Sequence, residues 1–436
     1  MIINNVADTI FMSSTGVSDV IRLPGMVDMH VHLREPGFSY KEDWATGTSA
    51  AIAGGVVAVV DMPNTNPPTI TLERLEEKKK IAKEKALCDY GFYFGSDGNN
   101  LAEFNKVYDR VLGLKLYLGE TTGASSQRHS RFSGSPIPVG DDKMEESVSL
   151  LMEDEKKVAD IFKAWPRGKP ILVHAEGERL ELAISLAEKN YQKLHCCHVA
   201  SKEDIEHAAK AKARGVQITC EVSPHHLFLT QKDVERLRPF GMMKPELGTA
   251  EDQRALWEHI QKGTVDCVAT DHAPHTKQEK LGIDLREPAP PRSASSADAS
   301  RTSPSEGGES INQVPSREGQ GWVFKGPWGV PGLETALPLL VTAMEEGRLT
   351  REQIISLTSV NPWRILGSRP PVQTSVEMEV GISYKVNEAE LKTKCGWSPF
   401  IGITLTARVV RTVIHGQEAY NNGKILSKGG SGKNII

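Results

Sequence analysis

Eight short apolar runs recur along the chain and alternate with stretches of helical pattern. The runs are MVDMH (26–30), VVAVVDM (56–62), CDYGFYFG (88–95), LGLKLYL (112–118), PILVHAE (170–176), KLHCCHVA (193–200), VQITCEV (216–222) and VDCVATD (265–271). Each is rich in β-forming residues and apolar enough to be covered on both faces, as parallel strands are. Helices are expected at 42–53, 71–86, 143–164, 176–190, 201–214, 250–261 and 333–346. This alternation predicts an α/β fold, a closed (β/α)8 barrel. An open doubly wound sheet is the alternative, but no glycine-rich phosphate turn follows the first run.

The two ends of the chain have a different pattern. Residues 1–24 and 370–436 are strand-like, and the segment ITLTARVVRTVIHGQEAY alternates with period two. We expect the ends to pair as a small β-domain beside a barrel of residues 25–369. Two segments rich in Gly, Ser and Pro, 119–142 and 286–320, are expected to be insertions, the second too poor in apolar residues to become ordered. Both follow predicted strands, at the end where a barrel carries its active-site loops.

Composition narrows the functional classes. The 436 residues include 52 basic and 56 acidic side chains, 39% hydrophobic residues and 25% charged residues, which is typical of a globular protein. A net charge of −4 argues against a non-specific nucleic-acid binder, and no apolar run is long enough to predict a membrane span. Six cysteines lie mostly inside apolar runs, which favours reduced thiols and a cytoplasmic protein.

Histidine, aspartate and lysine side chains stand near the ends of the predicted strands. The first run ends in His30-Val31-His32, and residues two apart in a strand point the same way, so both imidazoles can face one metal ion. Taken alone, such a pair could equally be two surface histidines. Later runs add further candidate ligands: Lys115, His174, His198 and Asp271. Because the carboxyl ends of barrel strands meet at one mouth, the six side chains together predict a metal centre there.

Lys115 is the unusual member of this set, because it lies inside the apolar run LGLKLYL. A charged lysine among such neighbours is costly unless it is paired or modified. Its charge could reach the rim or enter a buried ion pair. The functional alternative is a carboxylated lysine, whose two carbamate oxygens would serve two metal ions.

Three further residues are candidates for substrate contacts. Arg34 lies two residues beyond the second histidine and so points into the same mouth, Asn64 lies in MPNTNPP after the second run, and His275 lies in DHAPH after the last. An arginine with an asparagine suits a substrate carboxylate. The alternatives are a surface salt bridge of Arg34 with Glu35 or Asp43, and a turn-capping role for Asn64.

At this point the motifs resemble a known family. The segments are LPGMVDMHVHLREPG, MPNTNPP, GLKLYL, LVHAE, CHVAS, CEVSPHHLFL, KPELG, DHAPHT and VPGLET. They resemble dihydroorotase of the amidohydrolase superfamily, above all the dihydroorotase domain of the multifunctional pyrimidine-synthesis polypeptides of the CAD type. The resemblance runs from about Arg22 to beyond Trp363 and takes in the C-terminal β-segment.

The resemblance implies a role for each candidate. His30, His32 and Asp271 would hold one zinc ion, His174 and His198 a second, and carboxylated Lys115 with a hydroxide would bridge them. Arg34, Asn64 and His275 would bind the carboxylate and ring of dihydroorotate. Asp271 would carry the proton between the attacking water and the leaving nitrogen, in ring opening to carbamoyl aspartate or the reverse. Cys197 and Glu221 match positions that can take part in an additional metal site; the alternatives are a buried thiol and a structural carboxylate.

Two departures from the family pattern concern closure over the substrate. Where the family loop reads Asn-Glu-Thr-Phe, this chain reads Gly119-Glu120-Thr121-Thr122, so Thr122 replaces the large apolar tip that would expel water. Lys244 of KPELG stands where the animal enzyme has an arginine, and lysine cannot form the bidentate fork.

Two functions from different classes follow. One is a working zinc dihydroorotase. The other, which the departures favour, is a domain of lost or weakened activity kept for assembly between carbamoyl-phosphate synthetase and aspartate transcarbamoylase domains. A homodimer is expected in either case. An allantoinase- or hydantoinase-like cyclic amidohydrolase is a weaker alternative.

Overall fold

The computed structural model describes residues 19–119, 150–282, 314–315, 322–323 and 326–436. Apart from Gly119 and residues 314–315, both predicted insertions lie outside this part of the chain. So do the predicted loop residues Thr121 and Thr122. The short strands β10 (Val314–Pro315) and β11 (Trp322–Val323) pair antiparallel with each other.

Eight parallel strands form the centre of the molecule, in the order in which they occur in the sequence. They are β2 (Met26–Val31), β3 (Val56–Asp61), β4 (Asp89–Gly95), β5 (Gly113–Tyr117), β6 (Ile171–His174), β7 (Leu194–Cys196), β8 (Ile218–Val222) and β9 (Cys267–Val268). The His32 amide donates to the His272 carbonyl at 2.8 Å, and Val31 forms a parallel bridge with His272, so the last strand returns to the first. The predicted (β/α)8 barrel is confirmed.

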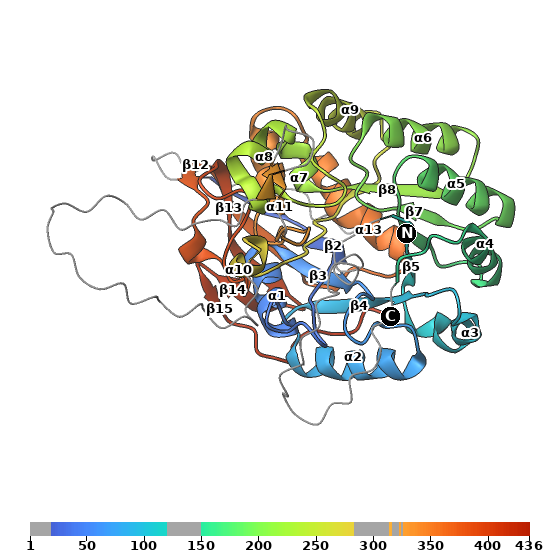
Figure 1. Cartoon of the computed structure of the whole chain (residues 1–436). Coiled ribbons are helices and arrows are strands. Elements are labelled where there is room, and N and C mark those ends of the chain that lie inside the picture. Colours follow the sequence, from blue (N-terminus) through green and yellow to red (C-terminus); the bar gives the residue numbers. More distant parts are fainter. Residues whose placement is uncertain (1–18, 120–149, 283–313, 316–321, 324–325) are drawn as a thin grey trace, which may run out of the picture.

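Helices lie outside the strands along the curved wall of the barrel (Figure 1). The longer ones are α1 (Trp44–Ala53), α2 (Leu72–Lys85), α4 (Glu155–Ala164), α5 (Glu178–Asn190), α6 (Lys202–Ala213), α9 (Ala250–Gln261) and α11 (Ala336–Glu345). The shorter ones are α3 (Phe104–Val107), α7 (Pro224–Phe228), α8 (Gln231–Leu237), α10 (Lys277–Lys280), α12 (Arg351–Ile355) and α13 (Asn361–Leu366). Most buried apolar side chains of the strands and helices belong to one core, and a second, smaller core contains strand residues such as Val27, Val60 and Leu172.

The predicted helix over 143–164 was too long at its start. Residues 150–154 are not helical, and Leu151 forms a bridge with Tyr117 instead. The helix begins at Glu155, because the Asp154 side chain accepts from the backbone N–H groups of the first turn and so caps it.

Two predicted strands were too long at their ends. The run 193–200 forms a strand only over Leu194–Cys196, and the run 265–271 only over Cys267–Val268. In both cases the backbone then turns through a residue of positive φ, His198 at +32° and Asp271 at +46°. These are the residues predicted to bind metal, so the strands end where the site begins.

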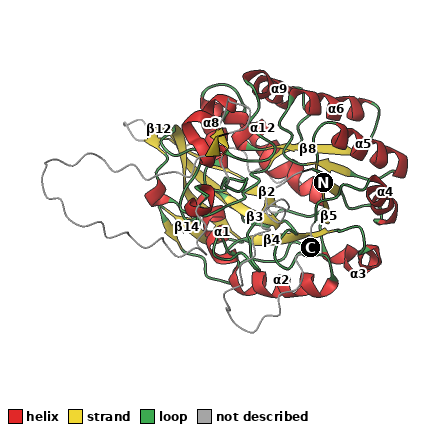
Figure 2. Cartoon of the chain, viewed as in Figure 1, coloured by secondary structure: helices red, strands yellow, loops and turns green. Residues whose placement is uncertain are grey.

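A five-stranded antiparallel sheet combines both ends of the described chain, as predicted. Its order is β1 (Asp19–Leu23), β12 (Ser375–Lys385), β13 (Thr404–Ile414), β14 (Gln417–Asn421) and β15 (Lys424–Ile425). The first strand pairs with β12, Asp19 opposite Val380 and Leu23 opposite Val376. In Figure 2 this sheet stands beside the barrel, on the side opposite to helices α4 to α6.

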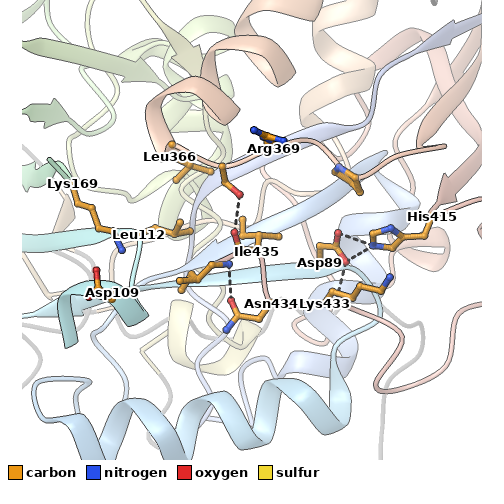
Figure 3. Close-up of a pocket in the computed structure, with 14 residues that line it drawn as sticks. Asp89, Asp109, Leu112, Lys169, Leu366, Arg369, His415, Lys433, Asn434 and Ile435 are labelled. Atoms are coloured by element: carbon orange, nitrogen blue, oxygen red, sulfur yellow. Dashed lines mark hydrogen bonds and ion pairs between the residues drawn. The ribbon is translucent and has the colours of Figure 1, made fainter. Parts of the chain in front are cut away.

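The last residues of the chain return from the small sheet to the barrel, which the sequence pattern did not predict. The Tyr90 amide donates to the Lys433 carbonyl at 2.9 Å, and the Ile435 amide to the Tyr90 carbonyl at 3.0 Å. They border a cleft of about 600 Å³ in which His415 and the Lys433 amide both contact Asp89 (Figure 3). Because Asp89 begins β4, this cleft is at the amino ends of the strands, the end that serves stability rather than catalysis in such barrels.

No helix in the described ranges is long and apolar enough to cross a membrane.

Lys280 is a fully buried lysine that ties two distant loops together. Its ammonium donates to the Met242 carbonyl at 2.8 Å, to Pro327 at 2.9 Å and to Gly329 at 3.1 Å. Burial lowers the pKa of Lys280 to about 7. The folded protein therefore releases this proton at a lower pH than the unfolded chain, in which lysine titrates near about pH 10.

This titration predicts a pH-dependent stability. Between about pH 7 and pH 10 the unfolded state binds the extra proton, so the free energy of unfolding should rise with pH, with a contribution from Lys280 approaching about 1.4 kcal/mol per pH unit. Lys280→Met should remove this contribution. Urea unfolding across that window measures it, and an identical pH slope in wild type and variant would contradict the prediction.

Candidate metal centre and substrate mouth

Two histidines and an aspartate meet at the carboxyl ends of the first and last strands. The Asp271 Oδ1 atom lies 3.0 Å from His32 Nε2 and 3.2 Å from His30 Nε2. His30 lies within β2, His32 directly after it, and Asp271 three residues after β9. All three side chains are buried, and their ligand atoms are close enough together to hold one metal ion.

A second pair of histidines adjoins this group. His174 ends β6 and His198 follows β7, and His174 Nδ1 lies 2.9 Å from His198 Nε2. The His198 ring is also next to His30, with 5.2 Å between their centroids. The structure therefore brings four of the predicted histidines and Asp271 into one mouth.

Lys115 of β5 is fully buried in the same mouth. Its Nζ atom lies 3.0 Å from the Cys197 Sγ atom and 5.2 Å from the centre of the Tyr117 ring. It makes no ion pair with any carboxylate that the structure describes. Both ordinary explanations, a charge that reaches the rim and a buried ion pair, are therefore missing here. A bare ammonium in this position lacks the compensation that burial requires, whereas a carbamate beside metal ions would have it.

Burial sets the protonation of these side chains. It lowers the pKa of His30, with help from the positive charge of Lys115, and it lowers the pKa of His32 and His198 well below the usual value. The imidazoles are therefore neutral and carry lone pairs, the form in which histidine binds a metal. Burial raises the pKa of Asp271, although the neighbouring His30 and Lys115 work to lower it.

Backbone strain marks three of the predicted site residues. Arg34, His198 and Asp271 have φ values of +63°, +32° and +46°, a region that L-residues seldom occupy. Such strain persists where the surrounding structure holds it, and it is commonest at functional sites.

Glu221 and Cys197 are buried beside the candidate metal ligands, Glu221 in contact with His30 and Cys197 with Lys115. One oxygen of Glu221 contacts His30 Nδ1, and the other lies 3.0 Å from His195 Nε2. Although burial works to raise the pKa of Glu221, the neighbouring His30 and His195 lower it, so Glu221 is a carboxylate. His30, Cys197 and Glu221 also approach closely enough to be a ligand set, as do His195, Glu221 and Cys267. Glu221 directs the other nitrogen of His30 towards Asp271.

Arg34 and His275 lie together at one side of the mouth. The Arg34 Nη2 atom is 3.1 Å from His275 Nε2, and Nε donates to the Pro274 carbonyl at 3.1 Å. The alternative salt bridges do not form, because Glu35 pairs with Lys85 and Asp43 with Lys394.

Asn64 reaches the metal ligands rather than acting only as a turn cap. Its Oδ1 atom lies 2.7 Å from His32 Nδ1. It thereby fixes the orientation of that ring and leaves His32 Nε2 facing Asp271.

Lys244 makes no hydrogen bond or ion pair with the predicted metal ligands among the described residues, although the carbonyl of the next residue, Pro245, lies 3.0 Å from His226 Nε2. Its Nζ atom pairs with Glu246 at 2.9 Å and lies over the Trp328 ring at 4.9 Å. It stands at the partly exposed rim, after α8 and the following turn.

Several buried residues of the mouth were not predicted. His225 and His226 lie in the first turn of α7. Three ring nitrogens are buried without a hydrogen-bond partner among the described residues: His225 Nε2, His226 Nδ1 and His198 Nδ1. The signal was available, because two consecutive histidines directly follow the eighth run in CEVSPHH. His272, beside Asp271, accepts from the Gly332 amide at 3.2 Å and faces the buried Glu42 at 3.4 Å.

Comparison with curated proteins finds close relatives. The chain is 36% identical over 417 residues to "Multifunctional protein pyr1-3" of Dictyostelium discoideum and to "Multifunctional protein CAD" of Squalus acanthias; in each case the match covers 95% of this chain and 16% of the relative. The chain thus spans about one sixth of the length of these relatives. It is also 30% identical over 441 residues to "Dihydroorotase" of Methanosarcina mazei, covering 95% of this chain and 86% of that protein.

Solved structures with the same fold include proteins named hydantoinase. "L-Hydantoinase (Dihydropyrimidinase) from Arthrobacter aurescens" superposes with a TM-score of 0.77 at 23% identity, covering 95% of this chain and 89% of the other. "Inactive dihydroorotase-like domain of Chaetomium thermophilum CAD-like multifunctional protein" has a TM-score of 0.68 at 23% identity, covering 96% and 99%. The profile described as "Amidohydrolase family" matches residues 21–370. With this match and the 30% identity to a whole dihydroorotase, the chain belongs to the amidohydrolase family, among relatives named dihydroorotase.

Proposed function

We propose that this chain is a metal-dependent dihydroorotase-type domain, which binds L-dihydroorotate and N-carbamoyl-L-aspartate and interconverts them slowly. The observation that carries the proposal is the meeting of His30, His32 and Asp271 with His174 and His198 around Lys115, a buried lysine without an anionic partner in the described chain. Relatives named dihydroorotase support the choice of substrate.

The donor set fits two zinc ions. His30, His32 and Asp271 would hold one, His174 and His198 the other, and Lys115 would reach both as its carbamate. Three or more nitrogen and oxygen ligands with room for water are the usual composition of catalytic zinc sites. When bound, the ions would lower the pKa of a water molecule and polarise the substrate carbonyl.

The protein side chains would then orient the substrate and move the proton. Arg34, Asn64 and His275 bind the carboxylate and ring. A water oxygen adds to the amide carbon, and the Asp271 carboxylate accepts the water proton. As the carbon–nitrogen bond breaks, Asp271 returns that proton to the leaving nitrogen, and the reverse sequence closes the ring.

Weakened turnover follows from the two departures in the sequence. Thr122 lacks the bulk to exclude water from the mouth. Lys244 pairs with Glu246 at the rim, which supports the proposal that it does not grip the substrate as an arginine would.

An assembly role is the second candidate function. It is favoured by the relatives themselves, since the chain spans only 16% of two multifunctional polypeptides. In this role the domain would form a homodimer and hold carbamoyl-phosphate synthetase and aspartate transcarbamoylase domains in place. All six cysteines are buried and free, as suits the reducing cytoplasm.

The test is metal content and turnover of the same preparation. Protein purified without chelator should contain two zinc ions per chain, and ¹³C-bicarbonate should label Lys115. Turnover in both directions should fall well below the order of ten per second of a typical enzyme. If the protein bound neither zinc nor ligand, the dihydroorotase proposal would be wrong and the assembly role alone would remain. A rate of the order of ten per second would contradict the proposal that turnover is weakened.

A further inference from the structure

The loop between β12 and β13 leaves the small sheet and packs against the barrel. It covers residues 386–403. Four of its side chains are buried in an apolar cluster that includes barrel residues from beyond β8 and β9: Val386, Cys395, Trp397 and Phe400. Trp397 is 2% exposed, and its ring meets the Phe240 ring edge-on, with 5.0 Å between the centroids. The loop therefore packs at the carboxyl ends of the barrel strands, although it belongs to the small β-domain.

The segment 271–275, which follows the last barrel strand, begins with a strained residue. Asp271 has a φ of +46°, a conformation that persists only where neighbouring contacts fix it. Residues from the barrel side provide some of these contacts. The His272 carbonyl accepts from the His32 amide at 2.8 Å, and the Ala273 amide donates to the Val330 carbonyl at 2.9 Å. Further contacts of the segment come from the loop between β12 and β13.

Trp397 contacts the last residue of the segment directly. Its indole N–H donates to the backbone carbonyl of His275 at 2.7 Å. Both residues are buried, so removal of the indole N–H would leave this carbonyl without the donor and without water in its place. Trp397 thereby fixes the end of the segment that is farther from Asp271.

Thr393 reaches the other end of the segment through Glu42. The Thr393 hydroxyl donates to the Glu42 carboxylate, whose Oε2 atom lies 3.4 Å from His272 Nε2. The Gly332 amide donates to His272 Nδ1 at 3.2 Å, so the proton of the neutral ring is on Nε2 and faces this carboxylate. Glu42 thus connects the loop to the residue that follows Asp271.

The loop is itself anchored to segments outside the small sheet. The Glu334 carboxylate accepts from the Lys392 amide at 2.8 Å and from the Thr393 amide at 3.1 Å. The Lys394 ammonium donates to the Ser39 carbonyl at 2.7 Å. With these contacts on both sides of Thr393, the loop can act as a fixed support for the segment that it touches.

We propose that Trp397 and Thr393 are positioning residues, which hold the segment 271–275 so that its first residue faces the candidate metal ligands of the first barrel strand. The small β-domain thereby takes part in metal binding. This inference rests on the proposed function for the metal, whereas the hold on the segment is a property of the chain without metal.

The first test compares Trp397→Phe with Trp165→Phe. Trp165 is the matched control, because it is 1% exposed and its indole N–H donates to the Lys169 carbonyl at 3.2 Å, beside the amino end of β6. Zinc affinity is measured by competition with a chelator, starting from metal-free protein. Trp397→Phe should weaken the binding of one of the two zinc ions by about tenfold, the size of effect that residues supporting metal ligands have. Trp165→Phe should bind zinc as the wild type does, and equal affinities in the two variants would overturn the inference.

A second readout needs no metal. In metal-free protein, amide hydrogen exchange of the peptide that contains residues 271–275 should be about tenfold faster in Trp397→Phe than in the wild type or in Trp165→Phe. The peptide that contains β4 serves as the internal reference. If its exchange were accelerated in Trp397→Phe as much as that of residues 271–275, the variant would open globally and the inference would be wrong.

Thr393 gives a test that does not depend on the folding of Trp397→Phe. Thr393→Val removes the hydroxyl and keeps the shape of the side chain, whereas Thr393→Ser keeps the hydroxyl. Thr412→Val is the control, because the buried Thr412 hydroxyl joins the small sheet to the Ile52 carbonyl at 2.7 Å. Thr393→Val should weaken zinc binding by about threefold or more, and Thr393→Ser and Thr412→Val should bind zinc as the wild type does.

Equal losses of zinc affinity in Thr393→Val and Thr393→Ser, or in Thr393→Val and Thr412→Val, would contradict a positioning role for the Thr393 hydroxyl. If the wild type binds no zinc, the proposed function is wrong. The exchange measurement then decides alone: the hold on residues 271–275 stands if Trp397→Phe accelerates their exchange selectively, and it falls if Trp397→Phe does not.

Discussion

Replacing Asp271 with alanine is expected to lower turnover by on the order of a thousandfold or more and to remove one metal ion per chain. The carboxylate faces two imidazoles at 3.0 and 3.2 Å, so its loss takes away a ligand and the group proposed to carry the proton. A positioned acid–base group alone accounts for about 10²- to 10⁴-fold in rate. Elemental analysis and turnover in both directions, on protein from the same purification, measure the two effects.

Asp160→Ala provides the matched control, because Asp160 is an exposed carboxylate on the outer helix α4. It should keep the metal content and the rate of the wild type. Asp271→Asn should retain more metal than the alanine variant, since an amide oxygen can still coordinate, but no more turnover. Full metal occupancy and an unchanged rate in Asp271→Ala would show that the six side chains are not the reacting centre.

The barrel could be predicted because its signal is local. Each predicted strand is an apolar run of five to eight residues. The helices between them have caps that the sequence displays, such as Asp43 and Asp154. The site residues followed from the same pattern, since a polar residue at the end of an apolar run has few explanations. What the pattern could not give was the point at which a strand ends, because that depends on tertiary contacts around His198 and Asp271.

Contacts between site residues and residues of distant segments could not be predicted from the sequence. Lys41 and Glu279 are ordinary charged residues in their own segments, and their ion pair beside His275 joins segments that are 238 positions apart in the sequence. The buried hydrogen bond between Thr393 and Glu42 likewise joins residues that are 351 positions apart in the sequence. Such pairs have no periodicity, so only the assembled fold reveals them.

Lys78 and Asp61 form a fully buried ion pair next to the loops that carry Arg34 and Asn64. Lys78 Nζ lies 2.5 Å from Asp61 Oδ2 and donates to the Met62 carbonyl at 2.7 Å, while Asp61 Oδ1 accepts from the Leu33 amide at 2.7 Å. Burial raises the pKa of Asp61 and lowers that of Lys78, so both groups resist ionisation and depend on each other. The pair joins helix α2 to the loops that carry Arg34 and Asn64.

Lys78→Met is expected to lower the free energy of unfolding by about 3–5 kcal/mol, because it leaves the Asp61 carboxylate buried without its counter-charge. Urea denaturation measures the loss. Lys79→Met is the control on the same helix, since Lys79 pairs with Glu76 at the surface and should change stability by at most about 1 kcal/mol.

The double variant Lys78→Met/Asp61→Asn separates the charge from the packing. Asparagine keeps an oxygen for the Leu33 amide and carries no charge, so the double variant should be more stable than Lys78→Met alone by at least about 1 kcal/mol. The single variant Asp61→Asn is measured as well. If the loss of unfolding free energy in the double variant equalled the sum of the losses in the two single variants, the two charges would not be coupled. The cost of Lys78→Met would then arise from packing of the lysine side chain. If the coupling is found, the ion pair stabilises the loop that bears Arg34 through the contact of Asp61 with the Leu33 amide. Ligand affinity should then be higher in the double variant than in Lys78→Met, as stability is.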